Sequence, residues 1–133
     1  MNVTAEVIRE EIIRKLIQTG KFDRKYAYIS ERSGYHCEYC QRDLLAPEAI
    51  GMWCIEHIVP RRLGGSDEQD NLAIACVVCN KLKGDWDPGN NGANNTRESR
   101  ITAANVHIND NRTKEEQHLR LIREIINYQF RAQ

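Results

Sequence analysis

Four cysteines in two closely spaced pairs are the first residues of this sequence whose types and spacing indicate chemistry. Two residues separate Cys37 from Cys40, and two separate Cys76 from Cys79. This spacing lets a tight turn direct both thiolates at one ion, and two such pairs fill the tetrahedral shell of Zn²⁺. Because four cysteines leave no open ligand position, we predict one structural zinc ion per chain. The alternatives are two disulfides or four reduced cysteines in the core.

The N-terminal residues bear on this choice, because they carry charges that interrupt the apolar core of a secretory signal. The charged residues are Glu6, Arg9, Glu10, Glu11, Arg14 and Lys15. We therefore expect a cytoplasmic protein in a reducing compartment, where disulfides are rare. The apolar stretches are also far shorter than the roughly 18 residues that span a bilayer, so we expect no membrane partner.

A second group of polar residues is associated with the cysteine pairs, which are separated by 35 residues. Glu56 and His57 are adjacent at the end of an apolar run, and Asn80 directly follows Cys79. The carboxylate of Glu56 can hold a hard divalent cation, and a neutral His57 imidazole can take a proton from water. Asn80, fixed by its zinc-binding neighbour, can offer a carbonyl oxygen to the same cation. The group therefore suits hydrolysis.

Several motifs within residues 37–83 together resemble the HNH endonucleases, of the ββα-metal type with an embedded four-cysteine zinc site. They are Glu-His-Ile-Val-Pro at 56–60, Gly-Gly at 64–65, Asn-Leu at 71–72 and Cys-Val-Val-Cys-Asn-Lys-Leu-Lys at 76–83. The spacings from 57 to 71 and from 71 to 80 are also similar to those of the HNH domain in RNA-guided effector nucleases. The resemblance covers about a third of the chain. It implies a small α+β fold with a treble-clef-like zinc site and flanking N- and C-terminal helices.

The resemblance also implies a role for each motif residue. His57 is expected to be the general base that activates the attacking water. Glu56, where the family more often has Asp, and Asn80 are expected to hold the catalytic cation, although Glu56 could instead orient His57. Asn71 is expected to brace the hairpin loop. Because Asn80 offers only oxygen, Mg²⁺ or Mn²⁺ is the expected cation.

Three basic residues near the motif are candidates for nucleic-acid contact. Arg61 and Arg62 follow Pro60, and Lys83 lies one helical turn beyond Asn80 on the same face. Such side chains can bind the phosphates that flank a scissile bond. The alternative for all three is an ordinary solvated position.

Apolar periodicity predicts the elements that position these residues. We expect a single domain over 1–133, with N-terminal helices in 1–34, the zinc-containing core in 35–87, an irregular segment at 88–112 and a C-terminal helix at 113–133. The finer expectations are helices at 4–19, 23–33 and 77–85, and strands at 52–59 and 72–76. Thr113 and Glu116 match a capping box, which predicts a helix start there.

The formal net charge is zero, from 19 Lys and Arg against 19 Asp and Glu, so any nucleic-acid affinity must come from a local patch. Residues 37–87 carry net −4, and the segments before and after them carry net +2 each. Bound zinc and magnesium would offset the acidic middle. We therefore predict modest DNA binding that is metal-dependent and weakened by salt.

The function we expect is a metal-dependent endonuclease that hydrolyses phosphodiester bonds in DNA, by nicking or by double-strand cleavage. Two alternatives stay open: a catalytically silent zinc module that binds nucleic acid or protein, and an RNA-cleaving or toxin-type HNH nuclease. The flanking helices contain no target-recognition module that we identify. A targeting partner protein is therefore a further expectation. The apolar faces of the helices at 4–19 and 114–131 could pack on the zinc core or on each other, and a homodimer through these terminal helices is the other possibility.

Overall fold

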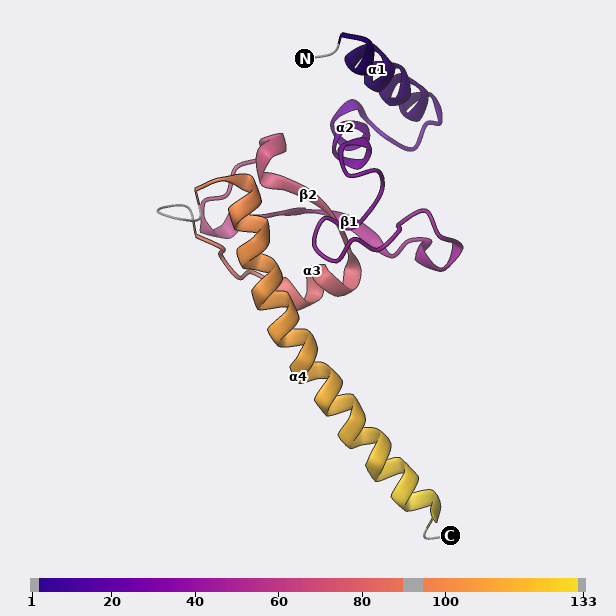
Figure 1. Ribbon diagram of the computed structural model, residues 1–133, viewed down its shortest axis with the longest axis vertical. Coiled ribbons are helices and arrows are strands. Elements are labelled where there is room, and N and C mark those ends of the chain that lie inside the picture. The colour runs from indigo at the N-terminus through magenta and orange to yellow at the C-terminus, as the bar shows by residue number, and fades with distance from the viewer. Residues whose placement is uncertain (1–2, 90–94, 132–133) are drawn as a thin grey trace.

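A computed structural model of the chain describes residues 3–89 and 95–131 (Figure 1). The helices and strands are, in order, α1 (Val3–Gln18), α2 (Arg24–Arg32), β1 (Trp53–His57), β2 (Leu72–Cys76), α3 (Val77–Lys83) and α4 (Arg97–Arg131). The small α+β fold predicted from the sequence is confirmed. Within the described ranges, no helix is both long enough and apolar enough to cross a bilayer.

The centre of the fold is an antiparallel hairpin of β1 and β2 followed directly by α3. The register pairs Trp53 with Cys76 at one end and His57 with Leu72 at the other. All five residues of β2 are buried, which explains its uninterrupted apolar and small-residue sequence. Cys76 ends the strand and caps α3, because its sulfur accepts a hydrogen bond from the Cys79 amide. The strand, strand, helix order matches the expected ββα core.

The N-terminal helices lie on one side of this hairpin, with α2 next to the core and α1 beyond it (Figure 1). Asp23 caps α2 as predicted, since its carboxylate accepts a 2.8 Å hydrogen bond from the Tyr26 amide. Ile29 of α2 is fully buried in the main core. By contrast, Val7, Ile8 and Ile12 of α1 are exposed.

A cluster of half-buried charges joins segments that are far apart in the sequence. Glu38, in the turn that carries the first cysteine pair, forms an ion pair with Arg97 of α4 at 2.6 Å and accepts a 2.9 Å hydrogen bond from the Ile74 amide. Arg32 of α2 and Arg97 both donate to the Leu72 carbonyl, at 2.7 and 3.0 Å. These contacts fix the start of β2 against α2 and α4.

The prediction of an irregular segment at 88–112 is wrong from Arg97 onward, where helix α4 begins. Residues 90–94 of that segment lie outside the described residues. Ala104 and Ile108 of α4 are 0% and 1% exposed and belong to the main core. Thr113 is an interior helix residue whose hydroxyl donates to the Asn109 carbonyl, so the predicted capping box does not start a helix. Tertiary packing has overridden the weak helix propensity of the Asn- and Thr-rich sequence.

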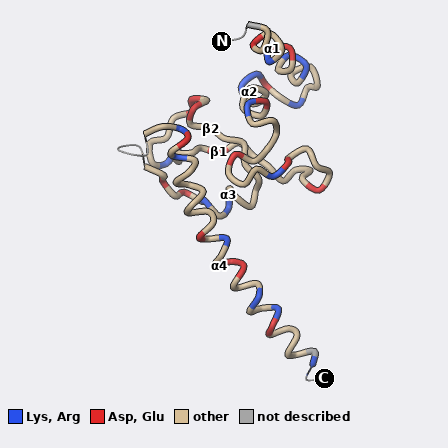
Figure 2. Tube along the Cα trace, in the orientation of Figure 1, with Lys and Arg blue, Asp and Glu red and all other residues tan. Residues whose placement is uncertain are grey.

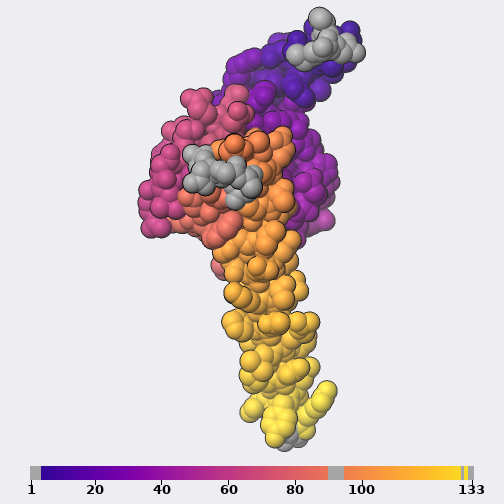
Figure 3. Space-filling model, turned by 60° about the vertical axis from the view of Figure 1, so that its left-hand side comes forward, coloured from indigo at the N-terminus to yellow at the C-terminus, as the bar shows by residue number. Residues whose placement is uncertain are grey.

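The second half of α4 extends away from the rest of the molecule as a single helix (Figures 1 and 3). Residues 113–129 are all exposed. Charges of both signs are distributed along this part (Figure 2).

Candidate metal centre and candidate active site

The two cysteine pairs meet where the turn before the hairpin approaches the start of α3. The sulfur atoms of Cys37, Cys40, Cys76 and Cys79 all lie within 4.8 Å of one another. Those of Cys40 and Cys76 are 3.8 Å apart. Four thiolates around tetrahedral zinc at about 2.3 Å have their sulfurs about 3.8 Å apart. All five cysteines are free, so the disulfide alternative does not hold. The cluster therefore fits one zinc ion.

Hydrogen-bond donors surround the sulfurs of the cluster and favour an ionised Cys37. The Cys40 amide lies 3.5 Å from the Cys37 sulfur, and the Cys79 amide lies 3.4 Å from the Cys76 sulfur. Arg112 of α4 adds a guanidinium donor at 3.3 Å from the Cys79 sulfur. The pKa of Cys37 is lowered to about 4, chiefly by a hydrogen bond from Cys79. The pKa of Cys79 is raised, chiefly by the same hydrogen bond, and burial raises the pKa of Cys40, so Cys37 carries the negative charge of the metal-free cluster. Thiolate is the form of cysteine that binds zinc.

His57 is the last residue of β1, and its side chain is 26% exposed. Its Nε2 atom lies 2.8 Å from Oδ1 of Asp67, and Arg61 donates to the same oxygen at 2.7 Å. These two neighbours lower the pKa of Asp67 to about 2, the hydrogen bond from Arg61 being the larger cause. Asp67 is therefore a carboxylate that fixes the His57 ring. No spacing rule identified it in advance, although it lies just after the double glycine.

The contact with Asp67 determines which ring nitrogen of a neutral His57 can act as a base. A carboxylate accepts hydrogen bonds only, so Nε2 must carry the proton. The lone pair then belongs to Nδ1. The arrangement resembles other sites in which a carboxylate fixes the tautomer of a histidine base.

The loop between the two strands is held by the side chain of Asn71. The Asn71 oxygen accepts a 2.9 Å hydrogen bond from the Val59 amide, and its nitrogen donates to the Val59 and Ser66 carbonyls at 3.0 and 2.8 Å. Gly65 passes so close to this point that a Cβ atom would lie 1.7 Å from the Val59 carbonyl oxygen. Both ends of the loop are thus fastened to one asparagine, which is the arrangement that a bracing residue requires.

Glu56 precedes His57 on β1 but points to the other face of the strand, because successive side chains alternate. Its side chain is 8% exposed, accepts a hydrogen bond from the Tyr39 hydroxyl and lies 3.2 Å from Nζ of Lys83. Burial raises the pKa of Glu56, and the nearby ammonium of Lys83 opposes that rise. The structure thus gives this carboxylate a protein cation as its partner.

The prediction that Lys83 contacts nucleic acid is not supported, because its side chain is fully buried and does not reach the surface. Its Nζ atom also donates to the His57 carbonyl at 3.1 Å, so this one side chain holds both residues of the motif. It cannot contact phosphate in this conformation. Asn80, one turn earlier on α3, lies on the same side of that helix and is half-buried.

Arg61 and Arg62 lie in a short 3₁₀ turn directly after the motif proline, beside His57. Both side chains are exposed, at 69% and 73%. Arg61 is paired with Asp67, and Arg62 lies 3.3 Å from Asp85. They form a small basic surface next to an otherwise acidic segment.

Comparison with protein families agrees with this geometry. Residues 37–85 match the family model described as HNH endonuclease. The matched segment contains the four cysteines, His57, Asn71 and Asn80, and it confirms the resemblance seen in the sequence. This part of the chain is similar to HNH endonuclease domains, a family whose members are generally nucleases. No curated protein and no solved structure matches the chain.

Proposed function

We propose that the protein is a metal-dependent endonuclease that hydrolyses phosphodiester bonds in DNA. The observation that carries the proposal is the His57 ring at the open end of β1, held through Nε2 by Asp67 at 2.8 Å. A general base must be both accessible and oriented, and His57 is both. A module that only binds nucleic acid or protein does not need an oriented base.

In this proposal His57 Nδ1 removes a proton from a water molecule, whose oxygen attacks phosphorus. The bond from phosphorus to the 3′ oxygen breaks, which leaves a 5′ phosphate and, after protonation, a 3′ hydroxyl. Asp67 stabilises the imidazolium that forms, because its carboxylate already accepts the Nε2 proton. His57 then returns its proton to solvent and is neutral for the next turnover.

Glu56 and Asn80 are the residues that we propose for the divalent cation, Mg²⁺ or Mn²⁺. Their oxygen donors and the resemblance of residues 37–85 to HNH endonucleases support this assignment. When bound, such an ion neutralises charge that develops on the phosphate and on the leaving oxygen. The Nζ atom of Lys83 lies 3.2 Å from the Glu56 carboxylate. The Lys83 ammonium and the divalent cation would therefore compete for the same carboxylate.

The two arginines supply the proposed contact with substrate. Arg61 and Arg62 are exposed next to His57, and their guanidinium groups suit phosphate oxygens in a bidentate manner. Two phosphate contacts give modest affinity, which we expect to fall as salt is raised. A targeting partner protein fits the same picture, because so small a basic surface carries little sequence information.

The test is cleavage of supercoiled plasmid by the zinc-loaded protein in Mg²⁺, Mn²⁺ or no divalent cation. We expect nicked product from the wild type with cation, and little from His57→Ala. The matched control is His118→Ala, the same change at an exposed histidine of α4, which should cleave like the wild type. Zinc content and circular dichroism of both variants verify that they are folded. A wild type that leaves plasmid intact in every cation contradicts the proposal.

The same preparation separates the two alternatives. A single-stranded RNA substrate cleaved with His57 dependence, while plasmid stays intact, would assign the protein to the RNA-cleaving class. Binding of plasmid without cleavage, unchanged in His57→Ala, would assign it to the silent binding modules.

A further inference from the structure

The projecting half of α4 exposes several large apolar side chains. Leu119, Ile122 and Ile126 are 61%, 51% and 48% exposed. Their spacing of three and four residues places them along one line of the helix. Contiguous exposed apolar surface of this kind marks an interaction site.

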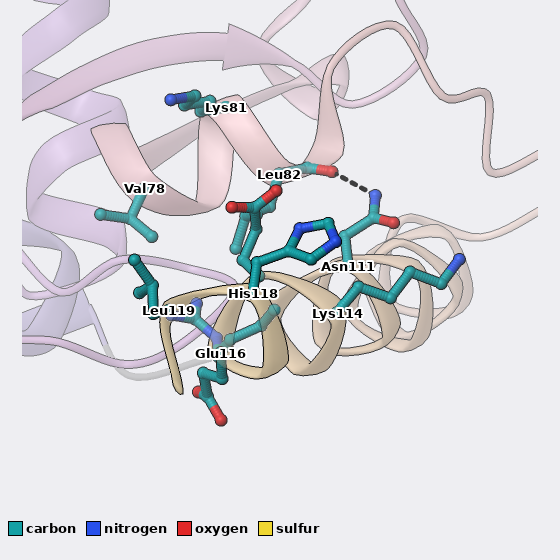
Figure 4. Close-up of a pocket in the computed structure, with 10 residues that line it drawn as sticks. Val78, Lys81, Leu82, Asn111, Lys114, Glu116, His118 and Leu119 are labelled. Atoms are coloured by element: carbon teal, nitrogen blue, oxygen red, sulfur yellow. Dashed lines mark hydrogen bonds between the residues drawn. The ribbon is translucent and has the colours of Figure 1, made fainter. Parts of the chain in front are cut away.

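This line continues into a notch between α3 and α4. Grooves lined by Leu119, Ile122 and Ile126 extend along the helix, and Leu119 also borders the notch of about 540 Å³. Figure 4 shows Val78 and Leu82 of α3 on one side of this notch and α4 on the other, with Leu119 below Val78. An elongated apolar partner can therefore lie along α4 and insert its end beside α3.

We propose that the occupant of this surface is a second copy of the chain, whose α4 packs antiparallel to the first. A two-fold axis level with residues 120 and 121 places Leu119 of each copy opposite Ile122 of the other. It also places Ile126 of the second copy level with Glu115, at the notch. The globular parts then lie at opposite ends, whereas a parallel pair would bring them to the same end of the helices.

Charge complementarity favours the antiparallel arrangement. Glu116 and Arg123 flank the apolar line on the same side of the helix, seven residues apart. In the antiparallel pair, Glu116 of each copy lies beside Arg123 of the other, so symmetry generates two ion pairs. In a parallel pair, two-fold symmetry would place the Glu116 and Arg123 flanks of the two copies on opposite sides of the seam, so neither ion pair could form.

The interface is small, because it consists of one helix seam and the end of a notch. Specific interfaces usually bury about 800 Å² on each partner, and those at the low end associate transiently. We therefore expect a reversible dimer with a dissociation constant on the order of 1–10 μM. The inference does not depend on the proposed nuclease activity.

The test is sedimentation velocity of the full chain from about 1 to 100 μM, a range that brackets the expected dissociation constant. The wild type should shift from a species of 15.4 kDa to one of twice that mass. Ile122→Glu should stay monomeric. The matched control is Val106→Glu, the same kind of change at a 60% exposed position on the opposite side of α4, which should still dimerise.

A charge swap tests the register. Glu116→Arg and Arg123→Glu should each weaken dimerisation by roughly tenfold, since each change breaks two symmetric pairs, and the double variant should recover most of the loss. Circular dichroism and zinc content verify that each variant is folded. A wild type that is monomeric over the whole range, a dimer of Ile122→Glu as tight as the wild type, or no recovery in the double variant would overturn the proposal.

Discussion

Two neighbouring motif residues, Glu56 and His57, have opposite environments. The His57 ring reaches the surface and contacts Asp67, whereas Glu56 is buried with Tyr39 and Lys83. Strand alternation is the cause, since adjacent side chains on β1 cannot share a face. The general base is therefore held by a carboxylate from the loop, and not by its neighbour in the sequence.

Asp67→Asn tests the role of that loop carboxylate. An amide oxygen still accepts the Nε2 hydrogen bond but stabilises the imidazolium less, so we expect kcat to fall by roughly tenfold or more with little change in KM. Asp67→Glu should recover part of the rate. Asp70→Asn, a neutralisation of an exposed carboxylate in the same loop, is the matched control and should be near wild type. Equal rates for Asp67→Asn and the wild type would show that Asp67 does not support His57 in catalysis.

The pH dependence of this contact follows from the lowered pKa of Asp67, which is about 2. A carboxyl with a depressed pKa keeps its ion pairs above its ordinary value and loses them as pH falls through the depressed one. Asp67 therefore stays ionised at every pH well above 2. The rate profile above pH 5 should show no inflection from Asp67.

Lys83→Met tests the buried ion pair. Removing the ammonium leaves the Glu56 carboxylate buried without a counter-charge, which costs about 3–5 kcal/mol. Burial already raises the pKa of Glu56, and loss of Lys83 raises it further. Protonation relieves the penalty, so the destabilisation should be largest near neutral pH and shrink as pH falls through the raised pKa.

Urea unfolding of Lys83→Met and wild type at two pH values measures this difference. The double variant Glu56→Gln/Lys83→Met should regain part of the lost stability, because it removes the buried charge as well. A loss that is independent of pH, or no recovery in the double variant, would show that Lys83 stabilises the fold through packing alone.

At the scale of elements, the four-cysteine cluster connects three segments: the turn before the hairpin, the end of β2 and the start of α3. Cys76 belongs to β2 and caps α3, while Arg112 joins α4 to the same cluster through the Cys79 sulfur. The ion would thus determine how α3 lies against β1. Since Asn80 and Lys83 are on α3, the active-site geometry depends on it.

Zinc removal should therefore abolish activity even when Mg²⁺ is present. We expect a strong chelator to lower the melting temperature and to remove hydrogen-exchange protection from β1, β2 and α3, with recovery on adding zinc. Cys79→Ser should behave like the chelated protein. Cys54→Ser, the same change at the cysteine outside the cluster, is the control. Full activity and protection after complete zinc removal would contradict this coupling.

Much of the core could be predicted from the sequence, because local signals and packing agree there. The strand at 72–76 was predicted at its true bounds, and Asp23 caps α2 as predicted. Helix α4 was not predicted before residue 113. Its apolar positions Ile101, Ala104 and Ile108 are separated by weak helix formers, and the buried contacts that stabilise it come from distant segments.

The candidate site divides in the same way. The four cysteines meet as their spacing predicted, because two short turns suffice to place them. Asp67, Tyr39 and the burial of Lys83 could not be predicted, since they depend on which face each side chain occupies in the folded hairpin. Sequence spacing gives positions along the chain, whereas these contacts depend on strand alternation and on the path of the loop.

At the scale of the whole molecule, an acidic core with the four-cysteine cluster lies between a helical pair at one end and a projecting helix at the other (Figure 1). Residues 37–87 carry net −4, so the exposed arginines beside His57 act against an unfavourable local field. Bound cations reduce that field. DNA binding should consequently strengthen when zinc and Mg²⁺ are bound and weaken with added salt, as filter-binding titrations would show.

The central claim is that His57 is the base of a nuclease, and chemical rescue tests it most directly. The measurement is the plasmid nicking rate of zinc-loaded His57→Gly in Mg²⁺, with and without added imidazole. The account predicts a loss of about 100-fold or more and a partial, concentration-dependent recovery with imidazole, which replaces the missing ring. A variant that nicks as fast as the wild type without imidazole, or a wild type that does not cleave, would contradict it.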